Sequence, residues 1–185
     1  ALTIDEKGMA KTGPEKARVA KRIYNILTQQ YGIRPEDIFF DALTFTIGSG
    51  SEEFRNAADA TLEGIRLIKK EMPGVHTILG VSNISFGLSQ HSRPVLNSIF
   101  LSEAIEAGLD AAIVHAKKIL PIFKIAQDDI EAAKKLLRNQ WVEGKDPLQA
   151  YIEHFAKKAP DADAASAPKR SSATIEDILK NHILD

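Results

Sequence analysis

Short apolar runs alternate along the first 116 residues with longer stretches in which apolar positions recur every three or four residues. The recurring spacing predicts amphipathic helices, and the continuous apolar runs predict buried strands. The predicted strands lie at 1–4, 38–40, 76–81 and 111–114, and the predicted helices at 14–31, 53–71 and 94–107. Strands that alternate with helices in this way are typical of a parallel sheet covered by helices.

The pattern changes after residue 126. A helix is predicted over 127–140, and Asp146 followed by Pro147 is the N-cap of another over 147–158. Residues 159–172 are rich in Ala, Pro, Asp and Ser and predict a flexible linker. An amphipathic helix begins again near Thr174 and is cut by the chain end, so we expect a larger parent protein.

Composition narrows the classes of function. The 185 residues are 44% hydrophobic and carry a formal net charge of -1, which gives no electrostatic footprint for nucleic acid or an anionic membrane surface. There is no cysteine, hence no disulfide frame or thiolate metal site in this chain. No apolar run approaches the ~20 residues of a membrane span, and no signal peptide opens the sequence. A cytoplasmic location is expected.

Polar side chains follow two of the predicted strands. Asp41 ends the second strand, and Asn83 follows the third in a loop that also contains Ser82. Carboxyl ends of parallel strands are where α/β proteins build their sites. A carboxylate can accept two hydrogen bonds from an amidine-like ring edge, and an amide can both donate and accept. The alternatives are a helix N-cap or a loop salt bridge for Asp41, and local turns for Asn83 and Ser82.

The other candidates carry weaker signals. Arg93 stands at a helix start, an unfavourable place for a cation unless an anion or another acceptor compensates. His115 follows the fourth strand and could face the same edge, whereas Asp5 and Glu6 after the first strand are equally consistent with solvated side chains. No residues have metal-ligand spacing, no Ser-His-Asp set is suggested, and no phosphate-binding glycine fingerprint occurs.

Two motifs resemble the pterin-binding barrel of the cobalamin-dependent methionine synthase family: IFFD at 38–41 and GVSNISFG at 80–87. Neighbouring segments resemble the same family: YNILT at 24–28, PEDI at 35–38, GSEE at 50–53 and AIV at 112–114. The resemblance covers about 1–116. The tail at 173–185 also resembles the start of the helical cap of that family's cobalamin module.

The resemblance implies an α/β fold, the second half of a (β/α)₈ TIM-type barrel. It divides the chain into a partial barrel at 1–126, a helical extension at 127–158, a linker at 159–172 and the start of the cap at 173–185. Four strands are present where such a barrel has eight, so the chain alone is expected to be inactive.

The resemblance also implies a methyltransferase. Asp41 would bind the pterin ring of 5-methyltetrahydrofolate, and Asn83 would contact the ring nitrogen that carries the methyl group. Ser82 and Arg93 are further candidate contacts. The methyl group would pass to cobalamin and on to homocysteine, with cobalamin and zinc in other modules of the parent. The alternatives are a stand-alone methyltetrahydrofolate:corrinoid-protein methyltransferase, dihydropteroate synthase, or a non-catalytic α/β interaction module.

Overall fold

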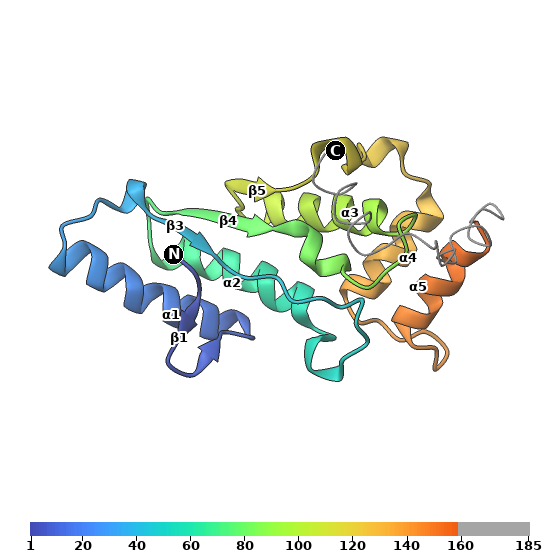
Figure 1. Ribbon diagram of the computed structural model, residues 1–185, viewed down its shortest axis with the longest axis horizontal. Helices are drawn as coiled ribbons and strands as arrows, with labels where there is room; N and C mark the ends of the chain where they lie inside the picture. Colours follow the sequence, from blue (N-terminus) through green and yellow to red (C-terminus); the bar gives the residue numbers. More distant parts are fainter. Residues whose placement is uncertain (159–185) are drawn as a thin grey trace, which may run out of the picture.

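A parallel sheet with helices packed on one of its faces forms the centre of the computed structural model, which describes residues 1–158 (Figure 1). The strands, in the spatial order β3-β4-β5, are β3 (Phe39–Asp41), β4 (His76–Gly80) and β5 (Ala111–Ile113). The connecting helices are α1 (Gly13–Asn25), α2 (Ala57–Glu71) and α3 (Arg93–Glu106). The predicted parallel sheet with alternating helices is therefore confirmed.

The two faces of the sheet differ in burial. Phe40, Thr77 and Leu79 are completely buried beneath the helices. The residues that alternate with them point the other way, and of these Phe39 is 44% and Ile113 62% exposed. Within residues 1–158 that second face has no helical cover, and we call it the open face.

The N-terminal segment differs from its prediction. Leu2 forms a parallel bridge with Asp41, and the Asp41 backbone N–H donates to the Ala1 carbonyl (2.8 Å), so the chain start does lie beside β3. The next residues turn back into a short antiparallel hairpin of β1 (Ile4–Asp5) and β2 (Gly8–Met9). Such short strands carry no periodicity from which they could be predicted.

Helix boundaries agree with the predictions to within a few residues. α1 starts at a capping box in which Thr12 and Glu15 satisfy each other's backbone N–H groups, and it continues as a π-helical turn (Ile26–Gln30). A 3₁₀ turn (Glu52–Phe54) precedes α2, so the long helix itself begins four residues later than predicted. With the π-helical turn counted as part of the first helix, the start of α2 is the largest difference.

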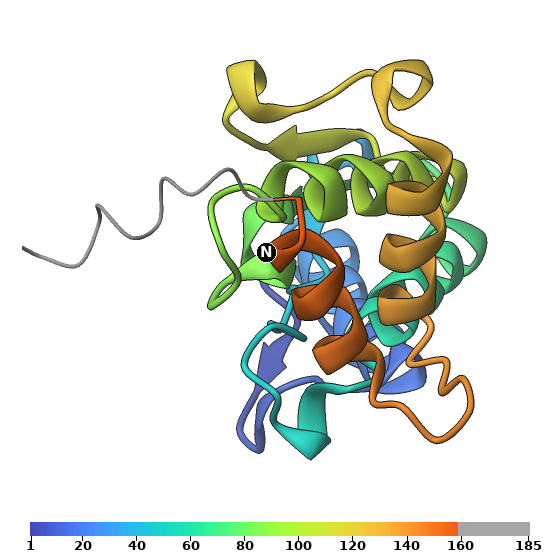
Figure 2. The ribbon, with the colours of Figure 1, turned by 90° about the vertical axis from the view of Figure 1, so that its right-hand side faces the viewer.

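The helical extension packs against α3. It consists of α4 (Gln127–Leu137) and α5 (Pro147–Ala156), which lie side by side (Figure 2). The predicted cap of α5 is confirmed, since Asp146 accepts hydrogen bonds from the first backbone N–H groups of that helix. The buried Tyr151 hydroxyl donates to the Ser92 carbonyl at the start of α3 (2.8 Å). One hydrophobic cluster thus joins α4 and α5 to the sheet and its helices.

The predicted linker at 159–172 and the predicted cap at 173–185 lie outside the described residues. Within 1–158, no helix combines the length and the apolar character needed to cross a lipid bilayer.

Candidate functional site

Asp41 lies at the carboxyl end of β3, in register with Ile78 of β4, and belongs to the alternating set that faces the open side. Its Oδ1 accepts a hydrogen bond from the Leu43 backbone N–H (2.8 Å). Its Oδ2 has no hydrogen-bond partner among residues 1–158. Asp41 is therefore not a helix N-cap, and half of its carboxylate is available to a ligand.

A buried lysine holds the loop that follows Asp41. The Lys16 side chain is completely buried, and its ammonium donates to the carbonyls of Ala10 (2.9 Å), Ala42 (2.7 Å) and Leu43 (3.1 Å). Burial lowers the pKa of Lys16 to about 8, and the negative charge of Asp41 opposes that shift. Lys16 therefore remains protonated at neutral pH.

The same loop contains a strained residue. Leu43 has φ +59°, in the left-handed region that branched side chains avoid at a cost of roughly 1–2 kcal/mol. This conformation points its N–H back to Asp41 while its carbonyl accepts from Lys16. The ammonium thus stabilises the conformation that orients the carboxylate.

Sequence reasoning missed Lys16, although two signals were present. Lys16 shares its helix face with Ala20, Ile23 and Leu27, at the spacing of an apolar stripe. Opposite it, Gly64 interrupts the middle of α2, and a Cβ at that position would lie 2.7 Å from Lys16 Cδ. The glycine makes room for the lysine side chain between the two helices.

Asn83 lies in a 3₁₀ turn (Val81–Ser85) directly after β4 and is exposed. A Cβ built on Gly80 would point to the open face, and Asn83 Nδ2 would lie 3.5 Å from it. The amide group therefore folds back over the end of β4, on the same face as Asp41. Within residues 1–158 it makes no side-chain hydrogen bond, so the alternative of a local turn former finds no support.

Arg93, the first residue of α3, supports this turn. Its Nε donates to Ser85 Oγ (3.1 Å) and its Nη2 to the Ser82 carbonyl (3.3 Å). These acceptors compensate for a cation at a helix N-terminus. Ser82 contributes its backbone carbonyl to this network, and its side chain is free within the described residues.

The loops after β3 and β4 are joined to each other. The Ile47 backbone N–H donates to the Ile84 carbonyl (3.2 Å), and the Thr46 hydroxyl donates to the Phe86 carbonyl (2.6 Å). Gly48 allows this approach, since a Cβ there would lie 2.6 Å from the Phe86 carbonyl oxygen. Asp41 and Asn83 are thus held on one connected edge.

A cavity of about 250 Å³ continues the edge toward β5. Its lining includes Ser82, Arg93, Asn97, His115 and Lys118. Neither Asp41 nor Asn83 lines it. By contrast, Asp5 and Glu6 form ion pairs with arginines of α1 and are not brought to this edge.

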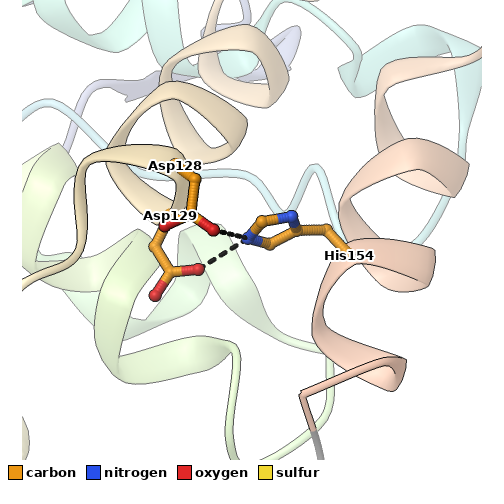
Figure 3. Close-up of side chains that lie close together, drawn as sticks. All are labelled: Asp128, Asp129 and His154. Atoms are coloured by element: carbon orange, nitrogen blue, oxygen red, sulfur yellow. Dashed lines mark hydrogen bonds and ion pairs between the residues drawn. The ribbon is translucent and has the colours of Figure 1, made fainter.

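A second polar cluster joins α4 to α5, and sequence spacing did not reveal it (Figure 3). His154 Nε2 lies 2.6 Å from Asp129 Oδ1 and 3.8 Å from Asp128 Oδ2. The Lys158 ammonium donates to Asp128 Oδ2 (2.6 Å) and to Asp129 Oδ1 (2.7 Å), and it keeps the pKa of Asp128 below its usual value. Because Lys158 already supplies the cation, we interpret the cluster as an ion-pair network between helices.

Comparison with known proteins gives the family. The model of the pterin binding enzyme family matches residues 2–115. The chain belongs to this family. It is also 47% identical over 175 residues to the methionine synthase of Mycobacterium leprae, and 48% identical over 155 residues to that of Mycobacterium tuberculosis.

These alignments cover 91% and 84% of this chain but only 14% and 13% of the relatives. The chain therefore spans about one seventh of the length of these curated relatives. The resemblance inferred from the IFFD and GVSNISFG motifs is confirmed at the level of the family.

The role of Lys16 can be tested by Lys16→Met in the intact protein that carries this chain. We expect the dissociation constant of a pterin ligand to rise about tenfold, because the loop carbonyls lose their common donor and Asp41 loses its orientation. In a protein that already carries Asp41→Asn, Lys16→Met should raise the dissociation constant by a smaller factor, since the two residues act on one contact with the ligand. Isothermal titration calorimetry gives both values.

Lys69→Met is the matched control. Lys69 also donates to a loop carbonyl, that of Val75 (2.9 Å), but at the amino end of β4. Its loss should lower the melting temperature and leave pterin affinity unchanged. If Lys16→Met loses as much stability as Lys69→Met but keeps its affinity for the pterin ligand, Lys16 has a purely structural role.

Proposed function

We propose that this chain is part of an enzyme that transfers the methyl group of 5-methyltetrahydrofolate to cobalamin and then to homocysteine in methionine synthesis. The observation that carries the proposal is the placement of Asp41 and Asn83 on the open face, at the ends of adjacent parallel strands. Membership of the pterin-binding family supports the substrate class. Both relatives bear the name methionine synthase, which favours this activity over dihydropteroate synthase or a stand-alone corrinoid-protein methyltransferase.

The architecture proposed for the parent is a closed (β/α)₈ barrel of which this chain supplies the second half. A parallel sheet with its helices on one face supports that proposal, because in a barrel the helices lie outside and the other face lines the interior. The exposed Phe39 and Ile113 would then be covered by the missing strands. The site residues stand at the carboxyl end, where barrel enzymes carry their chemistry.

Asp41 would bind the pterin ring through its ionised carboxylate. Two neighbouring N–H groups on one ring edge match two acceptor oxygens, and a charged acceptor strengthens both hydrogen bonds. The Leu43 N–H occupies only one lone pair of Oδ1 and fixes the plane of the group. The carboxylate is thus oriented before the ligand arrives.

Asn83 would act on the nitrogen that loses the methyl group. That nitrogen is a poor leaving group unless it gains a proton or a strong hydrogen bond. An amide can accept from the protonated nitrogen or donate to the free one, so it can hold the nitrogen more tightly as charge develops. Arg93, through its contacts with the turn, would position Asn83 rather than contact the ring itself.

Reduced cobalamin, held by another module of the parent, is the proposed methyl acceptor. Homocysteine and zinc are assigned to further modules. The linker, the cap helix and the cytoplasmic location remain predictions.

Asn83→Ala in the intact protein should slow methyl transfer about 10²–10³-fold while changing pterin affinity much less, since the lost contact is strongest in the transition state. Single-turnover methylation of cobalamin measures the rate, and calorimetry the affinity. Asn25→Ala, an exposed asparagine at the end of α1, is the control and should leave both unchanged. If Asn83→Ala methylates cobalamin at the wild-type single-turnover rate, Asn83 has no role in the methyl transfer.

Asp41→Asn should mainly weaken ligand binding, by about tenfold, because a neutral amide replaces a charged double acceptor of nearly the same shape. The dissociation constant of 5-methyltetrahydrofolate is the measurement. Asp37→Asn, four residues earlier and paired with Arg34 at the surface, is the matched control. The same dissociation constant in Asp41→Asn and wild type would contradict the assignment.

A further inference from the structure

The cavity beside β5 has a distinct chemical character. It offers two cationic side chains, Arg93 and Lys118, together with His115. No aspartate or glutamate of the described residues lines it. The Lys118 ammonium forms no ion pair within residues 1–158. Such a lining favours a ligand with negative charge.

Arg93 retains donors for such a ligand. A guanidinium has five N–H groups in a fixed fork. Two of its nitrogens, Nε and Nη2, contact the turn after β4. Its Nη1 makes no hydrogen bond within residues 1–158, so Arg93, which lines the cavity, keeps donors that match a carboxylate.

Asn97 adds an independent observation. It lies on α3 one turn after Arg93, lines the cavity and is only 9% exposed. Its Oδ1 is buried and has no hydrogen-bond partner within residues 1–158. A buried acceptor without a donor is unfavourable, so this atom calls for a ligand N–H group.

The order of the strands indicates the direction in which a ligand bound over β3 and β4 would extend. Asp41 ends β3, Asn83 follows β4, and the cavity lies between the turn after β4 and the end of β5. Neighbouring strands are about 4.8 Å apart, so the distance from β3 to β5 is about 10 Å. A folate whose ring lies over β3 and β4 is long enough to place its tail beyond β4.

We propose that this cavity binds the benzoylglutamate tail of the folate substrate. The amide N–H of the tail would donate to Asn97 Oδ1, and the glutamate carboxylates would pair with Arg93 and Lys118. This assignment rests on the proposed function, because it takes 5-methyltetrahydrofolate as the substrate. It makes the cavity the part of the site that distinguishes a folate from a pterin without a tail.

The test compares two ligands on the intact protein: 5-methyltetrahydrofolate and a 5-methyltetrahydropterin that lacks the tail. Lys118→Gln should raise the dissociation constant of the folate about fivefold and leave that of the pterin unchanged, as expected for one exposed charged contact. Asn97→Ala should likewise raise the dissociation constant of the folate more than that of the pterin. Lys117→Gln, the adjacent lysine outside the cavity, is the control and should alter neither value.

The outcomes separate this proposal from the proposed function. If both ligands bind but Lys118→Gln leaves the folate constant unchanged, or weakens both ligands equally, the cavity does not hold the tail and the pterin site stands. If neither ligand binds the wild-type protein, the proposed function itself fails and this assignment with it. Since Lys118 is exposed, its substitution leaves the core packing intact and the test remains decisive even if Asn97→Ala unfolds the protein.

Discussion

The buried ammonium of Lys16 is the interaction on which the candidate site depends. Removing a charge from water costs several kcal/mol unless hydrogen bonds replace the lost hydration. Here three carbonyls from two separate loops replace it, and in turn each carbonyl gains a charged donor. Because Leu43 contributes one of these carbonyls and also the N–H that contacts Asp41, it links the buried cation to the half-buried carboxylate.

The two faces of the sheet differ in burial and in the side chains that they present. One face buries Phe40, Thr77 and Leu79 against the helices and supplies the apolar burial that stabilises the fold. The other face presents Asp41 and Asn83 from loops that are hydrogen-bonded to each other. A ligand on this face would meet loops whose backbones are already held by these hydrogen bonds, so little backbone conformational entropy would be lost on binding.

The sequence predicted what depends on local pattern and on motif. Continuous apolar runs gave the parallel strands, and strand ends placed Asp41 and Asn83 at the same edge. The role of Lys16 was not predicted, because a lysine in a helix is ordinarily solvated and its burial depends on the crossing of α1 and α2 at Gly64. The contact of His154 with the Asp129 carboxylate, 25 residues earlier, likewise depends on how two helices pack, and no short-range spacing indicates it.

Arg93 connects the turn that carries Asn83 with the cavity beside β5. Its position at a helix start would be unfavourable without acceptors, and the turn that carries Asn83 supplies them through Ser82 and Ser85. The same guanidinium lines the cavity toward β5. A carboxylate in that cavity would add a charged partner and hold the guanidinium in the orientation that braces the turn. Binding of the proposed substrate tail would therefore stabilise the position of Asn83, so that contacts remote from the pterin ring would contribute to the orientation of the group that we propose acts on its nitrogen.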